Sequence, residues 1–181
     1  AGERSSGDIV VYTTDGGRDQ SGAIALGSGT SLLGSSGPVR LFTGHSENSK
    51  AKGGSLLLSA GNGGDISIAI EDGHSEGGSI LLASGKSDTA SSGNVDIVTA
   101  VATPSQRSGS VNIETGTSSG SASGSVTIAS GRGEQGSTGS VYVTVGNGES
   151  STGDLLLIGG DSVDAVAGSV VIAPGAGGTG G

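Results

Sequence analysis

Two glycine-containing stretches of this chain spell motifs that carry chemistry in other proteins. Residues 131–136 match the Gly-x-Gly-x-x-Gly fingerprint of dinucleotide sites, and residues 116–120 match the Gly-x-Ser-x-Gly spelling of a nucleophile elbow. The first motif requires a helix whose N-terminal amides hold a pyrophosphate, and the second requires a following helix and a nearby histidine. Both stretches join expected strands and are distant in sequence from His45 and His74. We therefore interpret both as chance matches in a glycine-rich chain.

The two histidines belong to a repeated tetrapeptide. Gly-His-Ser-Glu occurs at residues 44–47 and again at residues 73–76. Two imidazoles and two carboxylates on one edge of a repeat array could bind a divalent metal or respond to pH. A duplicated, solvated loop explains the same pattern, and it is the interpretation we favour. We expect no catalytic residue, no metal site and no cofactor.

Acidic loop residues raise the question of calcium. Residues 61–68 resemble one site of the calcium-binding nonapeptide solenoids, but they lack the Gly-x-Asp spacing of that family and do not recur every nine or eighteen residues. Solubility explains the acidic loops equally well. Weak contacts with divalent cations or glycans are kept as an alternative.

Composition excludes several classes of partner. The net charge of −9 at pH 7 and the pI near 4.4 leave no basic surface for nucleic acid or anionic lipid. The absence of cysteine excludes disulfides and zinc–thiolate sites. An aromatic content of 2% with 39 glycines is also typical of disordered chains, but disorder predicts no strict alternation of side-chain types. We expect neither nucleic acid nor membrane as a partner.

A repeat of about fifteen residues runs along the whole chain. Each repeat begins with a glycine, which we call the lead glycine, and aliphatic residues stand two and four places after it. The lead glycines are Gly7, Gly22, Gly37, Gly54, Gly64, Gly78, Gly93, Gly109, Gly124, Gly139, Gly153 and Gly168. A period of two predicts a strand with one buried face, and the Gly/Ser/Thr-rich segments between these strands are longer than most hairpin loops.

The expected fold is therefore all-β, a β-solenoid of about twelve short strands. Each unit of about fifteen residues could form a full coil, but we favour two facing strands in each rung of about thirty residues, because the loops contain few apolar residues to close a core opposite a single strand. A single repeat domain spans residues 7–174, between an extension at 1–6 and a glycine-rich segment at 175–181. The free energy favours this fold only narrowly, because ordering a glycine-rich backbone offsets most of the aliphatic burial. Ladder hydrogen bonds, and contacts beyond one chain, are needed to complete its stability.

Uncapped first and last strands predict end-to-end stacking of copies of the chain. The expected stacking edges are Asp8, Ile9, Val10, Val11 and Tyr12 at one end and Ser169, Val170, Val171 and Ile172 at the other. Between the paired aliphatic residues, one outer face carries apolar side chains that could form a lateral contact. These residues are Leu57, Leu81, Tyr142 and Val171.

The Gly-[Ser/Asp/Asn]-aliphatic-x-aliphatic repeats, as in residues 54–58 and 124–128, resemble repeats of large secreted adhesins and microbial surface fibres. The resemblance implies a non-catalytic structural protein, extracellular or on the cell surface, whose partner is itself in a filament or surface appendage. The alternative is a surface-binding module that meets ice, polysaccharide or mineral with one flat sheet face.

Overall fold

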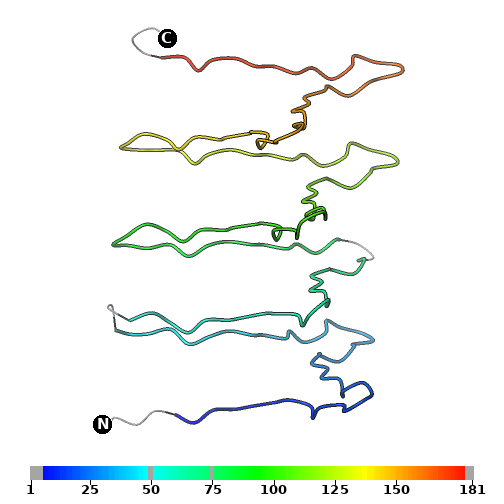
Figure 1. Cartoon of the computed structure of the whole chain (residues 1–181), viewed down its shortest axis with the longest axis vertical. Coiled ribbons are helices and arrows are strands. Elements are labelled where there is room, and N and C mark those ends of the chain that lie inside the picture. The colour runs from blue at the N-terminus through cyan, green and yellow to red at the C-terminus, as the bar shows by residue number, and fades with distance from the viewer. Residues whose placement is uncertain (1–5, 49–50, 74–75, 178–181) are drawn as a thin grey trace. The chain divides into compact units, whose positions relative to one another are not determined.

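The computed structural model describes residues 6–48, 51–73 and 76–177. Within these ranges the chain contains no helix and no strand, and Figure 1 shows extended stretches joined by turns and loops. The expectation of an all-β chain with a β-solenoid of twelve strands is therefore wrong. The sequence alternates as strands do, but the described segments are irregular.

Missing ladder hydrogen bonds explain this difference. The described residues form seven backbone–backbone hydrogen bonds outside regular elements, and all seven lie in turns or across the base of a loop. A strand exists only when its amides and carbonyls pair with those of a neighbour. Alternation sets which way successive side chains point, but it supplies no neighbour.

The paired aliphatic residues form no core. In the described chain no hydrophobic residue is buried. From the second repeat onward, the first aliphatic residue of each pair is 49% to 60% exposed, and the second is 60% to 86% exposed. Half-exposed side chains gain only part of the roughly 1.5–3 kcal/mol that full burial provides, while each ordered residue costs about 1–2 kcal/mol of backbone entropy.

The accessible surface area of the chain shows the same lack of burial. Its accessible area is 18715 Å², whereas a compact protein of 17.0 kDa would expose about 7,700 Å² and an unfolded chain about 25,000 Å². The isolated chain therefore leaves most of its apolar surface in water.

Contacts divide the chain into two compact units, Ala1–Leu82 and Ala83–Gly181. In the first unit the chain reverses at three described sites, where Gly16 accepts from the amide of Asp19 (3.0 Å), Gly44 from Gly54 (3.1 Å) and Gly61 from Gly64 (2.9 Å). Gly63 has a φ of 73° in the last of these turns, a conformation that strongly favours glycine.

In the second unit, hydrogen bonds close the loops Gly85–Gly93 and Gly160–Gly168, where the later glycine amide donates to the earlier carbonyl at 3.0 Å and 2.8 Å. A tight turn at residues 103–106 has Pro104 followed by Ser105, whose φ is 69°. This is the arrangement of a type II turn, in which glycine or asparagine usually occupies the place of Ser105.

Amide hydrogen exchange tests the distribution of order. We expect measurable protection at Gly54, Gly93 and Gly168, whose amides donate across loop bases, and little at mid-segment residues such as Val126. The reason is that protection reports hydrogen bonds that must open before exchange. Exchange followed by NMR on the dilute chain measures this. Uniform strong protection along the aliphatic segments would contradict the irregular fold.

Candidate functional site

The least exposed residues of the described chain lie at two positions of the repeat. Five residues are half-buried and the rest are exposed: Thr13, Gly16, Ser87, Ala102 and Gly159. Each stands six or nine places after a lead glycine. We call the residue six places after a lead glycine the neck position, and the residue nine places after it the loop position. Partial burial is therefore concentrated in the loops and not in the aliphatic pairs.

The neck position contacts the lead glycine of the next repeat. Thr13 Oγ1 donates to the carbonyl of Gly22 at 3.0 Å, and Thr43 Oγ1 donates to that of Gly54 at 3.0 Å. Thr115 Oγ1 does the same with Gly124 at 3.2 Å. Each of these three loops is thus closed by a side chain at its start and a glycine carbonyl at its end.

Close packing accompanies these hydrogen bonds. A Cβ atom added at Gly54 would lie 3.1 Å from Thr43 Cβ, and one at Gly78 would lie 2.8 Å from Ile70 Cγ2. At Gly109 the same atom would lie 3.5 Å from Thr99 Cγ2. The lead glycine therefore has a steric role at several necks, because the preceding neck side chain covers the space where its own side chain would be.

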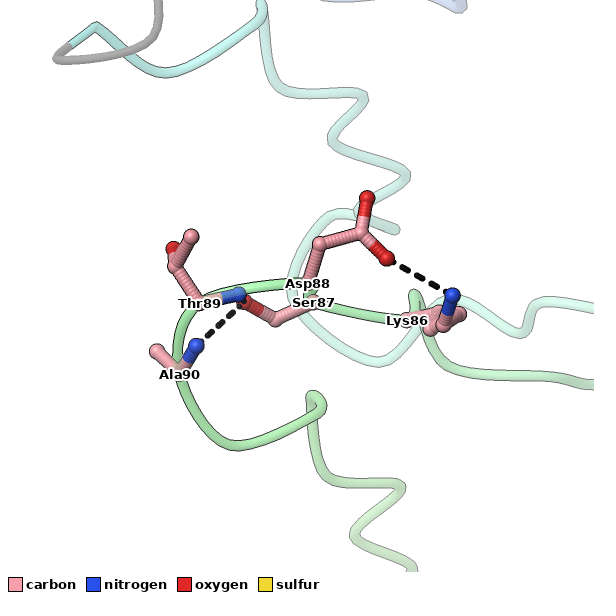
Figure 2. A network of polar contacts seen from close by, with 5 residues as sticks. All are labelled: Lys86, Ser87, Asp88, Thr89 and Ala90. Carbon is pink, nitrogen blue, oxygen red and sulfur yellow. Dashed lines mark hydrogen bonds and ion pairs between the residues drawn. The ribbon is translucent and has the colours of Figure 1, made fainter.

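The loop position is serine in five repeats, and its hydroxyl oxygen accepts a backbone amide two or three residues later. Ser87 Oγ accepts from the amide of Ala90 at 2.9 Å (Figure 2) and from that of Thr89 at 3.4 Å. Serine favours such turns because its side chain replaces a backbone partner. The other four are Ser31 with Gly34 at 3.1 Å, Ser46 with Asn48 at 3.3 Å, Ser118 with Ser121 at 3.2 Å and Ser162 with Ala165 at 3.0 Å.

The loop around Ser87 also contains an ion pair. Lys86 Nζ lies 2.6 Å from Asp88 Oδ1, and both side chains are more than four-fifths exposed (Figure 2). Exposed pairs of this kind contribute at most about 1 kcal/mol, because water screens the charges. The Ser87 hydrogen bonds are therefore the main local constraint, and the ion pair adds to it.

In four other repeats the loop position is a glycine with a carbonyl oxygen in the space beside its Cα. A Cβ atom at Gly16 would lie 2.5 Å from the oxygen of Asp19, and one at Gly133 would lie 2.6 Å from that of Gly136. Gly73 and Gly148 contact Glu76 and Ser151 in the same way, again three residues later. Serine loops and glycine loops thus turn by two different backbone arrangements.

The expected stacking edges are strongly exposed. Ile9 is 94% exposed, well above the first aliphatic residue of any later repeat, and Ile172 is the most exposed of the second aliphatic residues at 86%. Tyr12 and Val171 are exposed as well. These residues are available for contact with another molecule.

The expected lateral face falls on separate extended segments. Leu57 and Leu81 belong to the first compact unit, and Tyr142 and Val171 belong to the second. All four are at least four-fifths exposed. Without a sheet they do not share a common sheet face, so each is an independent exposed apolar side chain.

The chemistry suggested by the motifs has no framework in the described chain. No helix follows residues 116–120 or 131–136, and the stretch 116–120 contains the Ser118 turn. His45 is exposed, whereas His74 lies outside the described residues. The described residues include no group of three acidic or histidine side chains placed to hold a metal, and they enclose no cavity.

No helix in the described ranges has the length and hydropathy needed to cross a membrane. Comparison of the chain with protein-family models, with curated protein sequences and with solved structures finds no match. The function must therefore be argued from the surface of the chain and from its repeat.

Sequence reasoning missed the neck and loop positions. The sequence does contain a signal for both positions: the neck position is threonine in four repeats, and the loop position is serine or glycine in most repeats. The alternating aliphatic pairs pointed instead to the segments between the loops, where the described residues form no backbone ladder.

Replacement of Thr43 by valine tests the neck hydrogen bond. Valine keeps the shape of threonine but cannot donate to the Gly54 carbonyl, so we expect the Gly54 amide to exchange about two- to fivefold faster, as loss of about 0.5–1 kcal/mol implies. Exchange NMR measures the change. Thr43→Ser, which retains the hydroxyl, is the matched control, and equal acceleration in both variants would contradict the hydrogen-bond role.

Replacement of Gly133 by alanine tests the glycine loops. The new methyl group would overlap the carbonyl oxygen of Gly136, so we expect the backbone of residues 131–137 to rearrange. Gly131→Ala in the same loop is the control, because nothing lies within 4 Å of its added Cβ. Amide chemical shifts measure both. Large shifts should appear only with Gly133→Ala; the same small shifts in both variants would show that the carbonyl contact is not a constraint.

Proposed function

We propose that this chain is a non-catalytic structural protein that assembles with copies of itself into an extracellular filament or surface appendage. The observation that carries the proposal is the continuous supply of exposed aliphatic side chains, two from every repeat, in a chain whose described residues include no buried hydrophobic residue. Soluble monomers rarely expose apolar surface on this scale. Copies of the same chain present the same spacing of aliphatic pairs and are therefore suited to cover one another.

Two further features support assembly over catalysis. The serine and threonine hydroxyls with described hydrogen bonds, such as those of Thr43 and Ser87, serve to close loops. Regular repeats also allow many equivalent contacts along one molecule, so that individually weak contacts add up to a stable association. An extracellular location is proposed from the resemblance of the repeats to those of secreted adhesins and surface fibres.

The competing function is a surface-binding module for ice, polysaccharide or mineral. The exposed side chains that would serve it, such as Leu81 and Tyr142, lie on different extended segments and not on one sheet face. A flat ligand requires a regular rank of similar groups, whereas self-assembly requires only that two copies match. We therefore favour assembly.

A charge placed at Leu81 tests the proposal. Leu81 is 86% exposed, and Leu81→Glu replaces an apolar contact with a carboxylate that must be desolvated on association. We expect sedimentation velocity to show the native chain well above its monomer mass of 17.0 kDa, with a rising average mass as concentration rises. The variant should need about tenfold more protein for the same degree of assembly.

Asn112→Glu is the matched control, because Asn112 occupies the same repeat position as Leu81 but is polar and exposed. The control should assemble like the native chain. A native chain that stays monomeric over a hundredfold concentration range, and that instead adsorbs to ice or polysaccharide, would replace assembly by the surface-binding function.

A further inference from the structure

Charge is distributed unevenly along the chain. Residues 1–52, which we call the balanced segment, contain five Lys or Arg and five Asp or Glu, a net charge of zero. Residues 133–181, the acidic segment, contain five Asp or Glu and no Lys or Arg, a net charge of −5. Residues 53–132 contain seven acidic and three basic residues, a net charge of −4, which completes the total of −9. Most of the cations therefore lie at one end of the sequence and none at the other.

The described charged side chains of both segments are exposed and have no ion-pair partner within the described chain. Arg18, Arg40 and Lys52 of the balanced segment are all exposed. The one ion pair of the described residues joins Lys86 and Asp88, outside both segments. The acidic side chains of the second segment are Glu134, Glu149, Asp154, Asp161 and Asp164, and all of them are exposed. Each set is available to a second molecule.

We propose that copies of this chain associate head to tail, the balanced segment of one copy docking on the acidic segment of the next. This inference rests on the proposed self-assembly and adds its polarity. Two acidic segments repel each other, and pairing of two balanced segments leaves both acidic segments uncovered. Pairing of unlike segments places Arg18, Arg40 and Lys52 against carboxylates and uses both surfaces of every copy.

Both segments also contain the apolar surface that such a contact requires. Phe42 and the pair Leu32–Leu33 are exposed in the balanced segment, and Leu156 and Val163 are exposed in the acidic segment. Apolar burial provides the affinity, whereas the charges select the orientation and speed the encounter. Because the two surfaces are different, the contact is heterologous and each copy offers a free site to another, which generates an open polymer.

Charge-reversal variants of the two segments test the head-to-tail polarity of the assembly in the full-length chain. The tail variant carries Glu149→Lys, Asp161→Lys and Asp164→Lys, which changes the acidic segment from −5 to +1. The head variant carries Arg18→Glu, Arg40→Glu and Lys52→Glu, which changes the balanced segment from 0 to −6. Average mass is measured by sedimentation velocity at 20 mM and 500 mM salt, for each variant alone and for an equimolar mixture.

We expect each variant alone to need at least tenfold more protein than the native chain for half-assembly at 20 mM salt. The mixture should recover to within about threefold, because the new lysines of one variant meet the new glutamates of the other. The native assembly should also weaken at 500 mM salt, since exposed charges are screened beyond a few ångströms. The tail variant discriminates better between the two explanations. Its net charge is closer to zero than that of the native chain, so reduced general repulsion alone would predict stronger association, whereas the head-to-tail contact predicts weaker association.

The control for the tail variant has the same change in net charge placed between the two segments. It carries Asp65→Lys, Glu76→Lys and Asp96→Lys. This control should assemble at least as well as the native chain. Assembly that is unaffected in the tail and head variants, or that the mixture fails to restore, would overturn the polarity while leaving self-assembly intact. A native chain that is monomeric at every concentration would overturn both.

Discussion

Closure of each loop at its neck is the constraint on which the ordered part of this structure depends. A neck side chain, most often threonine, lies over the lead glycine of the next repeat, and in three repeats its hydroxyl also donates to that glycine's carbonyl. The contact is close because glycine has no Cβ, so a larger residue at Gly54 or Gly78 would force the two chain segments apart. Glycine recurs at this place for a steric reason, and the period of the sequence follows from the need to close one loop after another.

In this molecule the closure of the loops does not depend on burial of the aliphatic side chains. The loops have their own hydrogen bonds, as at Ser87, and they hold without any help from a core. In the described chain the aliphatic side chains between them remain about half-exposed or more, so much of their apolar surface stays in water. In the proposed assembly, a second copy of the chain would supply the apolar contacts, on segments whose spacing the loops set.

The sequence indicated the repeat and its loops but not the state of the segments between them. Alternation at Val126, Thr127 and Ile128 is the pattern of a half-buried strand, and it misled because pairing between segments is decided by contacts far apart in the chain. The loop contacts were predictable in principle. The neck position is repeatedly threonine and the loop position repeatedly serine, as at Thr13, Thr43, Thr115, Ser31, Ser87 and Ser118. Each of these side chains forms its hydrogen bond with a residue within about a dozen places along the chain. Local chemistry of this kind can be inferred from spacing, whereas the absence of strands requires a balance of energies that no spacing reveals.

The short range of the loop contacts has a consequence for the length of the molecule. The hydrogen bond of Thr13 spans nine residues, and that of Thr43 spans eleven, so each ties a repeat only to the next one along the chain. Removal or duplication of one complete repeat would leave every other loop with its own partners. Such a chain can change length by whole repeats through slippage or unequal recombination of its gene without refolding the remainder. The number of repeats can therefore change without altering the loops, because the loop residues are held by the geometry of a single turn.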